Sequence, residues 1–305
     1  MGHVVPTHDS LWPSAASLIT PAPVVGLRNV GLLGVSTYSS SLTPRSWHST
    51  PSAIREALER YSTWSYGDGV DLAREVALID YGDVFDPNGL GGRERVHEAV
   101  AKFDSSLDAR IILGGDNAAT WLTLAGLANG DFSNFGLITL DAHHDLRDGE
   151  SNGSPVRQLL DAGLDGAHVV QVGIADFLNS AMYAARARDA GITVLSRSDL
   201  RARSLDSVLA QALDVAGEGG RRIYVDIDMD VADLSVVPGC PAAAPGGLSA
   251  DELRQAARYL ASDPRVDTID ITEIDVERDS ADQRTVRLAA LLVLEVLAGV
   301  RRRSR

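Results

Sequence analysis

The sequence has one cysteine, Cys240, among its 305 residues, so no disulfide can form within the chain. We therefore expect a reducing compartment. Basic residues are also few: 28 Lys and Arg stand against 42 Asp and Glu, which gives a formal net charge of −14. Nucleic acid is not an expected partner, because phosphate binding needs a basic face. The one dense basic run, Arg301–Arg305, is predicted to be a solvated tail.

Long hydrophobic runs are absent as well. No stretch approaches the roughly 20 apolar residues of a transmembrane helix, and residues 1–21 lack the basic and apolar regions of a signal peptide. We expect a cytoplasmic protein without a membrane partner. Neither a repeat nor a clear linker interrupts the chain. Residues 26–305 are therefore predicted to form a single domain, preceded by an N-terminal arm over residues 1–25.

Short runs rich in Val, Ile and Leu alternate with helical patterns along the chain. Runs that are apolar almost throughout are typical of parallel strands covered on both faces. Helices are expected from Pro51, from the capping box of Ser249 and Glu252, and over Arg284–Val300. This alternation indicates an α/β protein with a parallel sheet between helices. The predicted strands are Val30–Val35, Val76–Gly82, Arg110–Gly115, Gly136–His143, Ala167–Ile174, Ile192–Leu195, Arg222–Asp230 and Val266–Asp275.

Carboxylates and a histidine gather where two of these strands end. In "DAHHD", Asp141, His143 and Asp145 occupy alternate positions, so on a strand they point the same way. The segment "DIDMD", residues 226–230, repeats the pattern. Several ionised carboxylates on one buried face need a divalent metal, because desolvation and mutual repulsion both oppose them. The alternative, that they cap helices in contact with water, suits a lone Asp better than two such clusters.

Two further predicted strands end in the polar motifs "GGDN", residues 114–117, and "TEID", residues 272–275. Ligands of parallel α/β sheets bind beyond the carboxyl ends of the strands, so four neighbouring strands would form one acidic mouth. The candidate metal ligands are rich in oxygen, with little imidazole and no thiolate, which favours Mn²⁺ over structural zinc. They exceed the needs of one ion, and a two-metal site can turn a bridging water into hydroxide at neutral pH. The pattern therefore predicts a hydrolase.

The motifs "GGDN", "DAHHD", "DIDMDVAD" and "TEID", in this order, resemble those of the ureohydrolase family: arginases, agmatinases, guanidinobutyrases and formimidoylglutamases. The resemblance spans Val30–Val300. It implies a three-layer α/β/α sandwich around a mainly parallel sheet of roughly eight strands. It also implies hydrolysis of a guanidinium or amidine carbon by a hydroxide that bridges two Mn²⁺.

The same resemblance implies roles for individual residues. Asp141 and Asp228 would bridge the two metals. His143 and Asp230 would bind one of them, and Asp145 would bind the other.

The neighbouring residues complete this implied site. The tail "VADLSVVPGCP" selects the frame in which Asp226 lies one step deeper than the ligands and Asp233 supports them from behind. Glu273 would face the amidine or guanidinium group. Asn117 stands where the family has a histidine. Its neutral carbonyl oxygen is a weaker donor for Mn²⁺, so one metal site is expected to be weak.

One feature points to a branch of the family. "DAHHDLR" resembles the Asp-Ala-His-Phe-Asp-Leu-Arg of formimidoylglutamases, with His144 at the Phe position. Arginases carry a histidine just before the Gly-x-Pro that follows this motif, and here Asn152 of "SNGSP" stands in that place, where we expect it to contact the substrate. Arg147 offers a planar fork for a substrate carboxylate. The alternative for Arg147 is an ion pair with Asp148 or Glu150.

The first choice is therefore a hydrolase of linear amidines, converting N-formimidoyl-L-glutamate and water to L-glutamate and formamide, as in histidine degradation. Asp145 would relay a proton to the leaving nitrogen, and Glu273 would hold the cationic amidine. The second choice is a guanidino substrate, such as guanidinobutyrate, agmatine or a hydroxylated arginine, with urea or hydroxyurea released. The third, suggested by Asn117, is a metal-poor protein that binds without catalysis. Relatives are often trimers or hexamers, which by analogy allows a homo-oligomer.

Overall fold

The computed structural model describes residues 9, 11–43 and 49–304. At its centre is a nine-stranded sheet in the order β1-β5-β2-β6-β11-β10-β7-β8-β9, with every neighbouring pair parallel. The eight predicted strands are all present, and the short β1 adds a ninth at the edge. The strands of this sheet are β1 (Ile19–Thr20), β2 (Arg28–Val35), β5 (Val76–Asp83), β6 (Ala109–Gly114), β7 (Phe135–Leu140), β8 (Val169–Val172), β9 (Thr193–Leu195), β10 (Arg222–Asp228) and β11 (Val266–Thr272). A separate antiparallel pair is formed by β3 (Trp64–Ser65) and β4 (Val70–Asp71).

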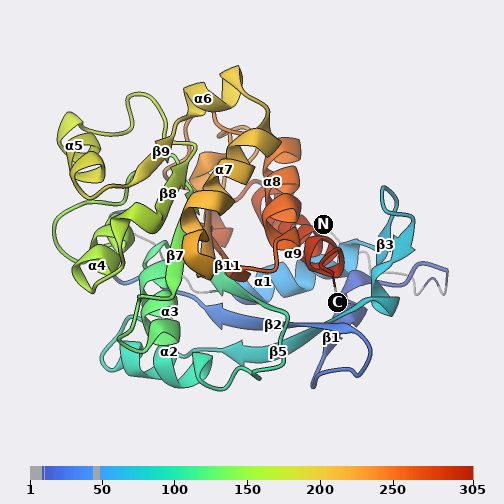
Figure 1. Ribbon diagram of the computed structural model, residues 1–305. Coiled ribbons are helices and arrows are strands. Elements are labelled where there is room, and N and C mark those ends of the chain that lie inside the picture. The colour runs from blue at the N-terminus through green and yellow to red at the C-terminus, as the bar shows by residue number, and fades with distance from the viewer. Residues whose placement is uncertain (1–8, 10, 44–48, 305) are drawn as a thin grey trace.

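Helices cover both faces of the sheet and complete the predicted three-layer sandwich (Figure 1). The helices α1, α7, α8 and α9 bury their apolar sides in one core cluster on one face, and α2, α3 and α4 cover the other face. The helices are α1 (Thr50–Ala57), α2 (Gly92–Val100), α3 (Ala118–Ala128), α4 (Pro155–Asp161), α5 (Ala181–Asp189), α6 (Arg197–Ala202), α7 (Leu205–Ala216), α8 (Ala250–Ser262) and α9 (Arg284–Arg301). Among the described helices, none has the length and apolar character that a membrane crossing needs.

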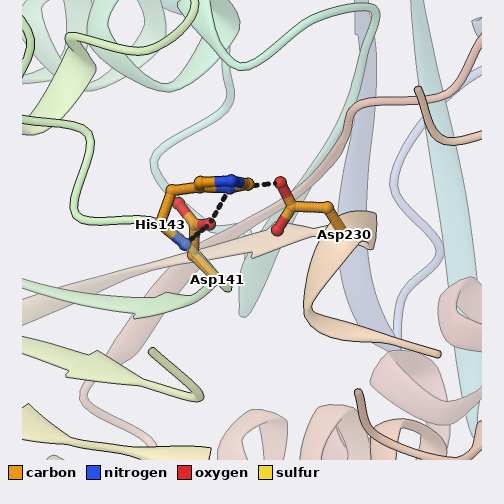
Figure 2. A group of neighbouring side chains, drawn as sticks. All are labelled: Asp141, His143 and Asp230. Carbon is orange, nitrogen blue, oxygen red and sulfur yellow. Dashed lines mark hydrogen bonds and ion pairs between the residues drawn. The ribbon is translucent and has the colours of Figure 1, made fainter. Parts of the chain in front are cut away.

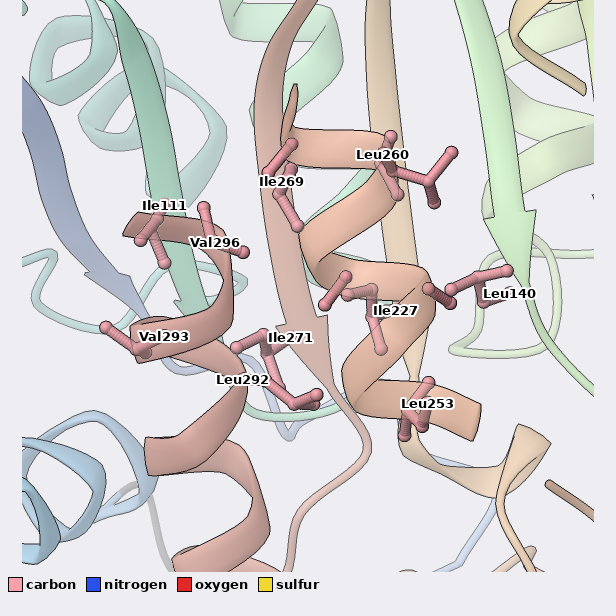
Figure 3. Packing of buried hydrophobic residues seen from close by; sticks show 14 of the residues in the cluster. Ile111, Leu140, Ile227, Leu253, Leu260, Ile269, Ile271, Leu292, Val293 and Val296 are labelled. Carbon is pink, nitrogen blue, oxygen red and sulfur yellow. The ribbon is translucent and has the colours of Figure 1, made fainter. Parts of the chain in front are cut away.

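Helices α8 and α9 show how the sequence patterns become packing. The capping box of α8 is present: Ser249 Oγ accepts from Glu252 N, and Glu252 Oε2 accepts from Ser249 N. Leu260 of α8 and Val296 of α9 are fully buried against the central strands, near Ile269 of β11 (Figure 3). Burial of each such side chain stabilises the fold by roughly 1.5–3 kcal/mol. This packing holds the central strands in place from one side.

The four strands with polar ends are neighbours in the sheet, in the order β6-β11-β10-β7. This confirms the condition for a single acidic mouth. However, β7 ends at Leu140, so the Asp141–Asp145 segment is a loop, and the predicted strand alternation does not align its side chains. Asp141 Oδ1 accepts from the backbone N–H of His143 at 2.6 Å, a turn that competes with strand pairing.

The same type of turn ends β10. Asp228 Oδ1 accepts from Asp230 N at 2.8 Å, so the chain leaves the sheet at Asp228 and enters the 3₁₀ turn Met229–Val231. Asp226 and Asp228 therefore lie on the same face of β10, whereas Asp230 lies in the turn and does not follow the alternation of a strand. Both acidic motifs converge because turns redirect them, not because strands continue.

The basic C-terminal run is not a solvated tail over its described part, and that prediction is wrong. Arg301 is still within α9, and Arg303 is 7% exposed. The guanidinium of Arg303 donates to the carbonyl oxygens of Ala261, Asp108 and Val266 at 2.6–2.8 Å. Carbonyl oxygens near the end of α8 and at the starts of β6 and β11 thus accept hydrogen bonds from this guanidinium. The sequence alone shows the charge of Arg303 but not these partners.

The division of the chain at residue 25 stays a prediction. Within the proposed arm, β1 pairs with β5, and Ala15 and Leu18 are buried in the main core cluster. The described part of the arm therefore packs against the domain.

Candidate active site

Three candidate ligands meet at one point beyond the ends of β7 and β10. Asp141, His143 and Asp230 each offer a ligand atom, and these atoms lie within 4.8 Å of one another. His143 Nδ1 lies 2.7 Å from Asp230 Oδ2 and 3.6 Å from Asp141 Oδ1 (Figure 2). Asp230 Oδ1 also accepts from Ala142 N at 3.0 Å, which fixes its carboxylate. The group comprises two buried carboxylates and one imidazole.

Asn117 and Asp145 lie together on another side of this cluster. Asn117 Nδ2 donates to Asp145 Oδ2 at 2.7 Å and to Asp226 Oδ2 at 3.4 Å. Its Oδ1 accepts from the hydroxyls of Thr120 and Thr272 at 2.7 and 3.1 Å. The amide therefore presents its N–H groups, not its carbonyl oxygen, to the carboxylates.

Glu273 joins the cluster from the end of β11. Its Oε1 accepts from Asn117 N and from Asn152 Nδ2, both at 2.8 Å. Its backbone N–H donates to Gly115 O at 2.7 Å. Gly115 has to be glycine, because an added Cβ would lie 2.1 Å from Thr37 O. Glu273 has φ 62°, a left-handed conformation that is uncommon outside glycine and concentrates at functional sites.

Asp145 shares this backbone feature, with φ 52°. The left-handed turn directs its carboxylate back to Asn117. Two candidate site residues thus carry backbone strain of the order of 1–3 kcal/mol each, which the surrounding fold must offset.

Asp226 lies one step deeper than Asp228 on the same face of β10, and it is fully buried. Its register partner on β11 is Asp270, which is also fully buried and accepts from Tyr224 Oη and Thr120 Oγ1. Burial and the Asp270 carboxylate raise the pKa of Asp226 well above its usual value. A proton shared between these two acids removes the need for a cation at this depth.

Two predicted residues lie at the margin of the cluster. Arg147 is exposed, and among the described residues its guanidinium has no hydrogen-bond or ion-pair partner. Asp148, its suggested alternative partner, pairs instead with Arg186 at 2.8 Å. Asp233 does not join the ligands: its carboxylate accepts from the N–H groups of Ser235 and Gly246 and holds a neighbouring turn.

The electrostatics of the cluster fit a divalent cation. Burial, then neighbouring carboxylates, raise the pKa values of Asp141 and Asp228 well above the usual range. Burial raises the pKa of Asp145 to about 7. Asp141 Oδ2 is buried without a hydrogen-bond partner among the described residues. No Lys or Arg of the described chain is paired with these acids in a salt bridge, and a divalent ion that prefers oxygen ligands would balance their charge.

His143 and Asp230 balance each other's charge. Burial lowers the pKa of His143, but the adjacent Asp230 carboxylate outweighs this and raises it to about 9. The same contact holds the pKa of Asp230 below its usual value against the effect of burial. A metal ligand must be a neutral imidazole, so binding of an ion there would release a proton.

A cavity of about 300 Å³ opens onto the cluster. Its lining includes His143, Asp145, Asp228, Asp230 and Glu273. The remaining walls carry few charges: Arg147 is the one Lys or Arg among the described lining residues, beside polar groups such as Asn152 and Tyr183. The cavity therefore combines an acidic centre with one cation at its margin, which suits a substrate with a cationic end and an anionic end.

Sequence reasoning missed several supporting residues. Asn179 bonds to the backbone on both sides of His143. His144 is buried, and its Nδ1 lies 2.6 Å from Gln171 Oε1. Asn179 and Gln171 belong to no motif, and the lone signal for Gln171 is a polar residue within an apolar strand.

The chain belongs to the arginase family, whose model matches residues 28–299. Formimidoylglutamase of Halalkalibacterium halodurans is 36% identical over 278 residues, which cover 88% of this chain and 86% of that protein. Formimidoylglutamase of Bacillus subtilis is 34% identical over 285 residues, which cover 90% of this chain and 88% of that protein. The predicted family is thus confirmed.

Solved structures agree in fold. The structure of the B. subtilis formimidoylglutamase matches with a TM-score of 0.89 at 31% identity, covering 99% of this chain and 96% of that chain. The structure of Trypanosoma cruzi formiminoglutamase with Mn²⁺ matches with a TM-score of 0.86 at 22% identity, covering 96% and 100%. The predicted α/β/α architecture is confirmed.

Proposed function

We propose that this protein is a manganese-dependent formimidoylglutamase that hydrolyses N-formimidoyl-L-glutamate to L-glutamate and formamide. The observation that carries the proposal is the buried carboxylate–imidazole cluster beside a cavity that is also lined by Arg147, whose guanidinium has no partner among the described residues. Relatives at 34–36% identity over most of the chain have the same named activity. Water adds to the formimidoyl carbon, the bond from that carbon to the glutamate nitrogen breaks, and that nitrogen gains a proton.

The residues that would hold the two ions are Asp141, His143, Asp145, Asp228 and Asp230, together with the amide of Asn117. The donor set is rich in oxygen and suits Mn²⁺. The chemistry that two such ions supply when bound is activation of water at neutral pH and polarisation of the amidine. Asp233 is not proposed in this role, because its carboxylate faces a separate turn.

The protein's own groups orient the substrate and move the proton. Glu273 is 3% exposed and lines the cavity, so its carboxylate can accept hydrogen bonds from the cationic amidine. Asn152 holds Glu273 through the 2.8 Å bond to Oε1 and lines the same cavity. Asp145 passes a proton to the leaving nitrogen. Arg147 binds a substrate carboxylate in bidentate fashion.

A guanidino substrate is the second candidate, because the proposed chemistry is the same for both classes. The specific observation that favours the diacid is Arg147 in the cavity wall, whose guanidinium pairs with none of the residues that the structure describes; it attracts glutamate carboxylates and repels the terminal ammonium of agmatine.

The test is a panel of N-formimidoyl-L-glutamate, guanidinobutyrate and agmatine with the Mn²⁺-loaded protein. We expect formamide and glutamate from the first compound in equal amounts, and kcat/KM at least about tenfold lower for the other two. Faster release of urea from agmatine than of formamide from formimidoylglutamate would refute this substrate. The third candidate, a binding protein without catalysis, predicts no product from any compound.

We also make proposals for the compartment, the partners and the oligomeric state of the protein. The acidic composition and the single cysteine support a cytoplasmic protein that binds neither nucleic acid nor membranes. We also propose one catalytic domain over residues 26–305 and a homo-oligomer by analogy. Size-exclusion chromatography with light scattering measures the oligomeric state.

A further inference from the structure

Asn179 connects two loops at the edge of the candidate site. It lies between β8 and α5, and its side chain reaches the loop that carries His143. Asn179 Oδ1 accepts from the backbone N–H of His144 at 3.0 Å, and Nδ2 donates to the carbonyl oxygen of Ala142 at 2.8 Å. These two peptide groups flank His143. One planar amide therefore bonds to the chain on both sides of a proposed metal ligand.

We propose that Asn179 is a positioning residue that fixes the backbone of His143 and thereby aims its imidazole at the metal site. The inference rests on the proposed function in one respect, that this cluster binds Mn²⁺. The imidazole is the sole nitrogen ligand of the group, with Nδ1 2.7 Å from Asp230 Oδ2 and 3.6 Å from Asp141 Oδ1. A small rotation of the His143 backbone would move this nitrogen away from both carboxylates.

The backbone of His143 needs these side-chain hydrogen bonds because of where β7 ends. Asp141 N donates to Val172 O of β8, and beyond that point the chain leaves the sheet. A neighbouring strand would offer one donor and one acceptor to the residues on either side of His143. The Asn179 amide supplies this pair from a side chain. The Asn179 loop is itself held, because Ala175 N donates to Ala142 O at 3.0 Å.

The chemistry is specific to an amide. Aspartate at this position keeps the acceptor for His144 N but loses the donor to Ala142 O, and it adds a negative charge near an acidic cluster. Leucine has nearly the same shape and loses both hydrogen bonds. At almost constant side-chain volume, aspartate therefore removes one of the two Asn179 hydrogen bonds, and leucine removes both.

Asn29 provides a matched control. Its Oδ1 accepts from Val24 N at 2.7 Å, and its Nδ2 donates to Val24 O at 3.2 Å, so it also holds a loop through one donor and one acceptor. It lies at the start of β2, whereas the candidate site lies beyond the carboxyl ends of the strands. Asn29→Asp removes an equivalent hydrogen bond at the amino ends of the strands, on the side of the sheet opposite to the candidate site.

The experiment titrates metal-stripped wild type, Asn179→Asp, Asn179→Leu and Asn29→Asp with Mn²⁺ by calorimetry. Loss of a group that orients a ligand weakens metal binding by about 10- to 100-fold. We expect this loss in one of two binding steps for both Asn179 variants, and none for Asn29→Asp. Hydrogen exchange of peptides covering residues 142–146 should be faster in the metal-free Asn179 variants and unchanged in the control.

Unchanged Mn²⁺ affinity in both Asn179 variants would overturn the inference, as would equal weakening of both steps accompanied by an equal loss in Asn29→Asp. Neither readout uses a substrate, so the proposed function fails separately. If the Asn179 variants weaken one step but the wild type forms no formamide, the positioning role stands and the proposed reaction is wrong.

Discussion

Asn117 points its amide nitrogen, not its carbonyl oxygen, at Asp145: Nδ2 lies 2.7 Å from Oδ2. The carbonyl oxygen accepts from the hydroxyls of Thr120 and Thr272. A metal ligand would have to present that oxygen, and turning the amide around disrupts these bonds. The proposed metal site beside Asn117 should therefore be the weaker of the two.

This predicts a two-step titration of the stripped protein with Mn²⁺. Asn117→His supplies an imidazole, a stronger donor that does not need the hydroxyls, and should tighten the weaker step by about tenfold or more. Calorimetry on both proteins measures the effect. A single tight step for two ions in the unmodified protein would show that the amide is not a handicap.

The two acids of β10 should differ sharply when substituted. Asp228→Ala removes a proposed bridging carboxylate and should abolish both metal retention and activity. Asp226→Asn should leave metal binding largely intact, because Asp226 already shares a hydrogen bond with Asp270 and its pKa is raised by burial. Metal content per chain after dialysis distinguishes the two. If Asp226→Asn strips the metal and Asp230→Asn does not, the proposed ligands are in the wrong frame.

Arg147→Gln should raise KM for N-formimidoyl-L-glutamate by roughly ten- to a hundredfold, since a charge-assisted pair contributes on the order of 1.5–3 kcal/mol. Its effect on agmatine should be neutral or favourable, and metal content should not change. Arg188→Gln is a matched control, because Arg188 lies on the exposed side of α5 beside Asp189. An equal rise in KM for both variants would show that the effect comes from the loss of one positive charge and not from a contact between Arg147 and the substrate carboxylate.

Arg303→Ala should destabilise the fold by about 2–4 kcal/mol, because it removes three hydrogen bonds from a charged donor to carbonyl oxygens, two of them buried and one partly buried. Arg302→Ala should cost less than about 1 kcal/mol: Arg302 is 44% exposed, and its partner Asp68 keeps Arg258. Urea unfolding compares the two. Equal midpoints would mean that the buried guanidinium contributes no more than a surface ion pair.

Those two arginines illustrate what the sequence could not predict. They stand next to each other in the same basic run, and tertiary contacts alone decide which one is buried. The strand ends were more predictable. Apolar runs and short motifs indicated that the four polar strand ends would lie at one end of a parallel sheet, because ligands of such sheets bind beyond the carboxyl ends of the strands. That these strands are neighbours, in the order β6-β11-β10-β7, is known from the structure alone.

The candidate site also combines features that the sequence predicts with features that it does not. Asp141, His143 and Asp230 belong to local motifs, so their residue types alone indicated a metal. The geometry that unites them comes from turns in which carboxylates bond to backbone N–H groups, and strand alternation misses this. Asn179 was out of reach: its contacts lie 35 and 37 positions away along the chain, and a lone asparagine in a loop carries no periodic signal.

The most direct measurement is formamide release from N-formimidoyl-L-glutamate while stripped protein is titrated with Mn²⁺ and the bound metal per chain is determined in the same samples. If the polar residues at the ends of β6, β11, β10 and β7 form a hydrolytic metal centre, the stripped protein should be inactive, and formamide release should rise to its maximum as two ions bind per chain. Full formamide release by the stripped protein, or two bound ions without any formamide, would contradict that claim.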